Sequence, residues 1–135
     1  MHPWKLAVVV RDDLEGWQRL NVTAFTVSGI GPTHPELIGE PYRDGSGRTY
    51  LPMFGLPVLV YAAPAEALGR AFRRALDRDL AVSPYTDDLF DTDNDVDNRA
   101  AVATVETDGL KLAGFAVAGD RRQVDKALDR LRFHP

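Results

Sequence analysis

A short apolar segment that ends in three charged residues constrains the fold of this chain most. The segment Leu6–Val10 contains no polar residue, and Arg11, Asp12 and Asp13 follow it directly. A continuous apolar run of this length is typical of a strand buried on both faces of a sheet. Ligands of open α/β folds bind outside the carboxyl ends of such strands. The sequence therefore predicts a cluster of polar side chains at one edge of a covered sheet.

Length and composition indicate one domain that spans residues 1–135. The chain is 44% hydrophobic, which is enough for a substantial core at this size. Its longest apolar runs, Leu6–Val10 and Leu56–Ala63, are far shorter than the roughly 20 residues that cross a bilayer. No signal-peptide pattern opens the chain, so we expect a cytoplasmic protein without membrane contact. The absence of cysteine excludes disulfides and thiolate catalysis.

Helical spacing follows the first strand. Trp17, Leu20, Ala24 and Val27 lie at intervals of three and four residues, and Gly29 is a natural stop signal. This pattern predicts a mostly buried helix over residues 17–28.

Strands and helices alternate along the rest of the chain. This order predicts a three-layer α/β/α sandwich with a mixed sheet of about four strands. The segment from Arg99 to Glu106 favours a buried helix capped by Asp97, with a strand as the alternative. The other predicted elements are a strand at Pro57–Tyr61, a helix that starts near Pro64, a strand at Leu80–Ser83 that ends at Pro84, a helical turn near Asp87–Phe90, a strand at Leu112–Ala118 and a final helix capped by Asp120 whose apolar side includes Leu131.

Residues 31–55 interrupt this alternation with many glycines and prolines. The Asp44-Gly45-Ser46-Gly47 turn predicts a small hairpin within this excursion. Long connections in small domains are commonly functional, so we expect the excursion to form a lid over a site. Tyr42, Arg43 and Tyr50 are its candidate ligand-binding residues, with Arg43 suited to an anion.

Several motifs together resemble the bacterial family known as domain of unknown function 2000. The resemblance extends over nearly the whole chain and implies no established activity. Its motifs are Val9-Val10-Arg11-Asp12-Asp13-Leu14, Leu20-Asn21-Val22-Thr23-Ala24-Phe25, Pro35-Glu36-Leu37-Ile38-Gly39-Glu40-Pro41-Tyr42, Pro57-Val58-Leu59-Val60-Tyr61 and Asn98-Arg99-Ala100-Ala101-Val102.

A more distant resemblance connects the chain with type II peptidyl-tRNA hydrolases. The shared pattern is a Val-Val-Arg-x-Asp-Leu strand end, a helix, a Val-rich strand, a second helix and a strand that ends near an aspartate. The resemblance implies a four-stranded mixed sheet with helices on both faces. It also places Asp87 at the acidic position of the family and Asp13 at the aspartate after the first strand, so both are candidate catalytic residues.

The first helix departs from the hydrolase pattern. The family has a lysine there and a glutamine four residues later, whereas this chain has Leu20 or Asn21 and then Ala24 or Phe25. These side chains cannot supply positive charge to a developing oxyanion. A formal net charge of −4 also argues against a surface that grips nucleic acid throughout. A tRNA substrate is therefore disfavoured.

The remaining candidate ligand-binding residues are polar groups in or beside apolar segments. Arg11 and Asp12 would bind a polar ligand at the strand edge beside Asp13; the alternative is an ion pair with a helix cap. Asn21 and Thr23 interrupt an apolar helix, where they bind either a ligand or a structural partner.

The sequence predicts no metal and no cofactor. The acidic segment Asp91–Asp97 superficially resembles a calcium loop, but Val96 replaces the expected glycine and Val102 the closing glutamate. The three histidines, His2, His34 and His134, lack the spacing of zinc ligands.

Two functional hypotheses follow from these residues. In the first, the protein binds a small molecule or hydrolyses an acyl ester or amide, with Asp13 or Asp87 as the base. In the second, it is a non-enzymatic protein that keeps the fold and forms a homodimer through the excursion or a sheet edge.

Overall fold

A mixed sheet of five strands organises the structure, in the order β5-β6-β1-β4-β7. The computed structural model describes residues 1–135. Strand β6 is antiparallel to both β1 and β5, while β1 and β4 are parallel. The carboxyl ends of β1, β4 and β5 therefore lie along one edge of the sheet. The strands are β1 (Trp4–Arg11), β4 (Val58–Ala63), β5 (Ala81–Thr86), β6 (Leu112–Asp120) and β7 (Arg132–Phe133).

The first strand lies at the centre of this sheet, as its apolar sequence predicts. All five side chains of Leu6–Val10 are fully buried. Ala7 and Val9 belong to the core on one face of the sheet, and Leu6, Val8 and Val10 belong to the core on the other. The predicted three-layer arrangement is therefore confirmed, with a short fifth strand in addition to the four expected.

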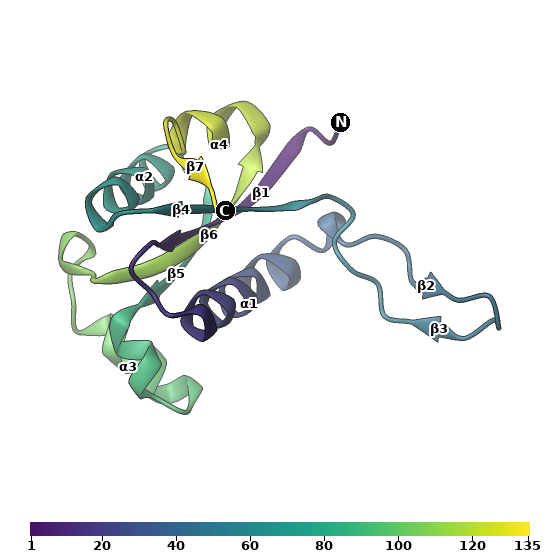
Figure 1. Ribbon diagram of the computed structural model, residues 1–135, viewed down its shortest axis with the longest axis horizontal. Coiled ribbons are helices and arrows are strands. Elements are labelled where there is room, and N and C mark those ends of the chain that lie inside the picture. Colours follow the sequence, from purple (N-terminus) through teal and green to yellow (C-terminus); the bar gives the residue numbers. More distant parts are fainter.

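Helices cover the two faces unequally (Figure 1). Helices α2 and α4 cover one face, and α1 covers the other. Because α1 packs mainly against β6, β5 and β1, the adjoining face of β4 has no helix over it. The helices are α1 (Gly16–Thr33), α2 (Ala65–Asp77), α3 (Asp95–Ala103) and α4 (Arg121–Ala127).

Helix α1 differs from its prediction in both length and orientation. It continues through Gly29 to Thr33, so Gly29 does not end it. A Cβ atom at Gly29 would lie 2.5 Å from Ser83 Oγ, which explains the glycine by close packing. The predicted apolar stripe is also not the buried one, because Trp17 is 59% exposed and Leu20 is 73% exposed. Val22, Thr26 and Ile30 face the core instead.

Three other elements require correction. Pro84 lies inside β5, where an edge position lets the sheet tolerate a residue without an N–H donor. Helix α3 is confirmed as a helix, but Asn94 caps it and none of its residues is buried. The final helix is capped by Asp120 as predicted, but it ends before Leu131, and β7 follows.

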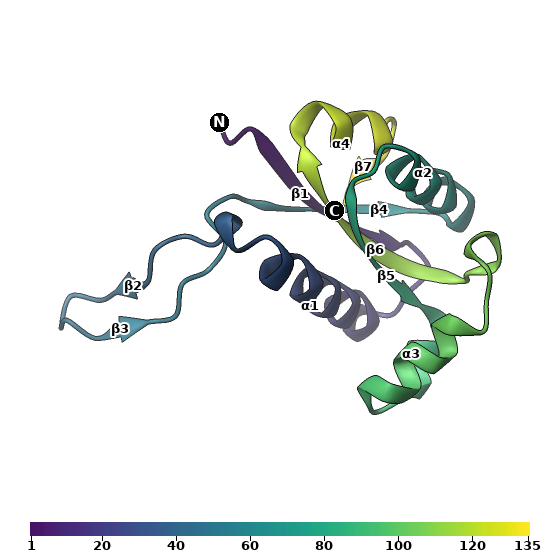
Figure 2. The ribbon, with the colours of Figure 1, turned by 180° about the vertical axis from the view of Figure 1, so that it is seen from behind.

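The excursion forms a hairpin arm that extends away from the sheet (Figures 1 and 2). The hairpin starts after the short 3₁₀ helix η1 (Pro35–Leu37) and contains β2 (Tyr42–Arg43) and β3 (Thr49–Tyr50). We call residues 39–53 the arm. Its turn is fixed by the Asp44 carboxylate, which accepts hydrogen bonds from Ser46 N, Arg48 N and Tyr50 Oη at 2.9 to 3.0 Å. The bond from Tyr50, with those from the backbone, lowers the pKa of Asp44 below its ordinary value.

The packing of β6 against β1 makes a testable prediction at Gly114. A Cβ atom there would lie 2.5 Å from the Val9 carbonyl oxygen and 2.7 Å from Val22 Cγ1. Overpacking of this kind costs about 1–3 kcal/mol, so Gly114→Ala should lower the free energy of unfolding by that amount in urea titrations. Gly45→Ala is the control, because no atom lies within 4 Å of its added Cβ. Equal stabilities of the two variants would contradict this packing.

Candidate functional site

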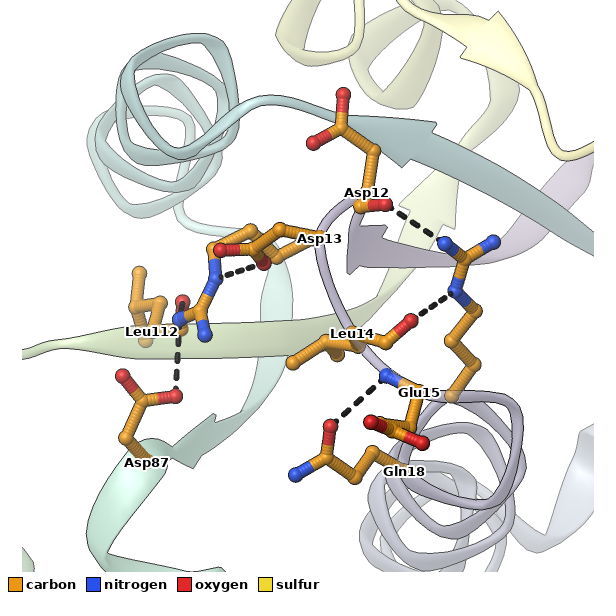
Figure 3. Close-up of polar contacts among 9 residues, drawn as sticks. Asp12, Asp13, Leu14, Glu15, Gln18, Asp87 and Leu112 are labelled. Atoms are coloured by element: carbon orange, nitrogen blue, oxygen red, sulfur yellow. Dashed lines mark hydrogen bonds and ion pairs between the residues drawn. The ribbon is translucent and has the colours of Figure 1, made fainter.

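Arg11 gathers polar groups from three strand ends at the carboxyl edge of the sheet (Figure 3). Its Nε donates to Asp13 Oδ1 at 2.6 Å, and its Nη1 donates to Asp87 Oδ1 and to the Leu112 carbonyl oxygen at 2.9 Å each. Arg11 is the last residue of β1 and Asp87 directly follows β5, so two parallel strands bring them together. The predicted convergence of Arg11, Asp13 and Asp87 is present.

The positive charge of Arg11 is paired with two carboxylates. Burial acts to lower the pKa of Arg11, but its hydrogen bonds to Asp13 and Asp87 outweigh burial and raise that pKa. The Arg11 side chain is 16% exposed, whereas those of Asp13 and Asp87 are 66% and 40% exposed. Arg11 therefore ties the ends of β1, β5 and β6 together. The catalytic roles of Asp13 and Asp87 stay predictions, and each carboxylate already has one oxygen bound to Arg11.

Of the other predicted ligand-binding residues, Asn21 and Thr23 have structural partners, and Asp12 stands apart from the cluster. The Asp12 side chain points away from those of Asp13 and Asp87 (Figure 3). The Asn21 Oδ1 atom accepts a hydrogen bond from Tyr85 Oη at 2.8 Å. The Thr23 hydroxyl donates to the Arg19 carbonyl oxygen at 2.8 Å, one helical turn earlier. These bonds satisfy two of the polar groups that interrupt the apolar sequence of α1.

The arm does not cover the Arg11 cluster. Helix α1 runs antiparallel to β1 and returns the chain to the opposite end of the sheet before the arm begins (Figures 1 and 2). Tyr42, Arg43 and Tyr50 are therefore remote from Arg11, and the prediction of a lid over that edge is wrong.

A cavity of about 610 Å³ lies between α1 and β4. It occupies the region beside α1 where β4 lacks a covering helix. Seven of its ten lining residues are apolar. Of the residues predicted to bind ligand, it includes Thr23. The ten residues are Val10, Arg19, Leu20, Thr23, Ala24, Val27, Phe54, Val58, Val60 and His134.

Arg19 is the cationic residue of this cavity. Its Nε donates to the Leu14 carbonyl oxygen at 3.0 Å, its Nη2 to the Asp12 carbonyl oxygen at 2.6 Å and its Nη1 to His134 Nε2 at 2.9 Å. A guanidinium only donates, so His134 Nε2 accepts and His134 Nδ1 carries the proton that it donates to the Pro135 oxygen at 2.8 Å. No carboxylate lies within ion-pair distance of Arg19.

Sequence reasoning missed Arg19 because its partners are distant or main-chain groups. His134 is 115 residues away, and carbonyl oxygens carry no side-chain signal. The one sign of this site in the sequence was an arginine beside the apolar stripe of a helix. This combination is common on protein surfaces and does not by itself indicate a site.

No helix of the structure combines the length and the apolar character of a membrane-spanning segment.

The hydrogen bonds from Arg11 to three strand ends predict that its loss lowers the stability of the fold. Arg11→Ala leaves two carboxylates and one carbonyl oxygen without their shared donor, and hydrogen bonds to charged groups contribute about 1.5–3 kcal/mol. We expect the free energy of unfolding to fall by roughly 1–3 kcal/mol in urea titrations, with Arg43→Ala on the exposed arm near wild type. An Arg11→Ala protein as stable as wild type would show that the cluster does not hold the strand ends together.

Comparison with known proteins places the chain in a family. Among solved structures, a protein of unknown function, Atu0240 from Agrobacterium tumefaciens strain C58, is 43% identical over 100% of both chains, with a TM-score of 0.96. No curated protein matches the chain significantly. The family model described as "Protein of unknown function (DUF2000)" matches residues 4–135, and the chain belongs to this family.

Proposed function

We propose that the protein binds a small amphipathic anion in the cavity between α1 and β4. The ligand has an apolar body and a carboxylate or similar anionic head. The observation that carries this proposal is Arg19, a half-buried cation beside an apolar cavity with no carboxylate partner.

The cavity suits the apolar body of such a ligand. Small-molecule sites commonly enclose about 300–1,000 Å³, with mostly apolar walls and few polar groups. The cavity of about 610 Å³ has this composition. Its α1 wall extends from Arg19 to Val27, which at 1.5 Å per residue is a length of about 12 Å. A medium-length acyl chain or an aromatic acid fits these dimensions.

Arg19 suits the anionic head. A buried or half-buried charge is normally paired, and an unpaired charge is costly. The carbonyl oxygens of Asp12 and Leu14 and the ring of His134 hold the guanidinium in one orientation but leave its positive charge unneutralised. Arginine presents a planar fork that matches a carboxylate. Arg11 already has two carboxylate partners, so Arg19 is the better site for an anion.

Binding without hydrolysis is the activity that this arrangement supports best. We propose a fold like that of type II peptidyl-tRNA hydrolases, supported by the mixed sheet with helices on both faces. Both candidate bases, Asp13 and Asp87, are nevertheless paired with Arg11. The helix position that the hydrolases fill with lysine is Leu20 or Asn21 here. Fold similarity alone does not transfer an activity.

Decanoate is a direct probe of the anionic head. Isothermal titration calorimetry should detect its binding to the wild-type protein, and Arg19→Gln should weaken that binding by roughly 10- to 100-fold, because a charge-assisted hydrogen bond contributes about 1.5–3 kcal/mol. Arg99→Gln, on the exposed helix α3, is the control for loss of one positive charge. Equal affinities of wild type and Arg19→Gln would remove Arg19 from the site.

A second variant tests the apolar part of the site without changing Arg19. Ala24 lines the cavity and is exposed, so Ala24→Phe should fill the space and prevent decanoate binding while the unfolding midpoint stays near wild type. Ala100→Phe, at an exposed position of α3, is the matched control. Undiminished decanoate binding by Ala24→Phe would exclude this cavity as the site.

A further inference from the structure

Large apolar side chains exposed to solvent are concentrated on two segments of the molecule. Of the eleven such residues, seven belong to α1 or to the arm. Single exposed apolar residues are ordinary, but concentrated ones mark an interaction surface. The seven are Trp17, Leu20, Phe25, Tyr42, Tyr50, Leu51 and Met53.

The exposed surface of α1 has the regular spacing of a packed helix face. Trp17, Leu20, Ala24 and Val27 follow one another at intervals of three and four residues, the pattern that normally contacts a core. The sheet instead receives Val22, Thr26 and Ile30. Helix α1 therefore has a second apolar stripe, formed by Trp17, Leu20, Ala24 and Val27. Val27 packs partly on the core and the Trp17 ring contacts the Phe90 ring, whereas Leu20 and Ala24 stay exposed.

The arm has apolar side chains but no packing partner within the chain. Its strands contain two residues each, and an isolated two-stranded hairpin is at best marginally stable in water. Leu51 is 82% exposed, and Tyr42, Tyr50 and Met53 are each at least half exposed. The turn is held by Asp44, so the arm is shaped before it contacts anything.

We infer that two copies of the chain form a dimer in which the arm of each copy packs on the α1 stripe of the other. One chain carries both surfaces, so a two-fold arrangement covers each stripe and each arm once and leaves no open end. The six of these side chains that lie on the stripe or the arm present on the order of 700 Å² per copy, within the range that one partner contributes to a specific interface.

The same contact completes the ligand cavity. Leu20, Ala24 and Val27 belong to both the stripe and the cavity wall, and Phe54 at the base of the arm also lines the cavity. An arm from the second copy that covers the stripe therefore closes the open side of the cavity. This part of the inference rests on the proposed ligand site, whereas the dimer itself does not.

Sedimentation velocity tests the dimer directly. The wild-type protein should be a dimer at micromolar concentration, and the double variant Leu51→Asp with Met53→Asp should be a monomer, since two charges would be buried without partners. Both substitutions lie on the exposed arm, so the sheet of the monomer should remain folded. Its thermal unfolding midpoint should therefore stay high. Val96→Asp, at an exposed position of α3, is the control and should remain a dimer.

Cross-linking tests which surfaces meet. The chain has no cysteine, so Ala24→Cys in one preparation and Leu51→Cys in another supply single thiols. Oxidation of the mixture should give a disulfide-linked pair of one Ala24→Cys chain and one Leu51→Cys chain. A monomeric wild type, a double variant that remains dimeric, or absence of this mixed product would overturn the inference.

Decanoate titration separates the two proposals. Loss of the closing arm should weaken decanoate binding about tenfold in the Leu51→Asp, Met53→Asp monomer. If this monomer binds decanoate as tightly as the wild-type dimer, closure of the cavity by the arm is wrong and the ligand site stands. If the dimer behaves as expected but wild type does not bind decanoate, the ligand proposal fails and the arm contact stands.

Discussion

Burial of β1 on both faces is the constraint on which the rest of the structure depends. Leu6–Val10 are fully buried, and β1 pairs with β4 on one edge and β6 on the other. Each large apolar side chain among them contributes about 1.5–3 kcal/mol by leaving water. The sheet gains this stabilisation only if helices cover both of its faces. The direction of β1 also determines where Arg11 emerges, and Arg11 in turn ties the ends of β5 and β6.

Sequence reasoning predicted the layers and the polar edge because both follow from local patterns. An unbroken apolar run predicts a two-faced strand, and strand ends predict where Arg11 and Asp87 meet. It failed on α1 because that helix has two apolar stripes, and spacing alone does not tell which stripe faces the sheet. In the structure Val22, Thr26 and Ile30 face the sheet, and Gly29 lies close to Ser83 of β5. The continuation of β5 through Pro84 and the strand β7 were missed because both depend on which strands lie at the edges of the sheet.

The two arginines near the sheet edge illustrate why residue type alone does not identify a site. Arg11 ends a strand and looks like a ligand-binding group, yet two carboxylates and a carbonyl oxygen accept its hydrogen bonds. Arg19 gives no such signal, but two carbonyl oxygens and the His134 ring orient it, and no carboxylate neutralises it. The distinguishing quantity is the local charge balance, which depends on residues far apart in the chain.

The closure at the base of the arm makes the hairpin separable from the sheet. Gly39 N donates to the Met53 carbonyl oxygen, and Gly55 N donates to the Leu37 carbonyl oxygen, both at 2.7 Å. Residues 40–52, beyond these two hydrogen bonds, contribute no side chain to either core. The tip is thus a module that insertions, deletions or a grafted sequence can alter at little cost to folding. Homologues can diversify their contacts there while the sheet stays unchanged.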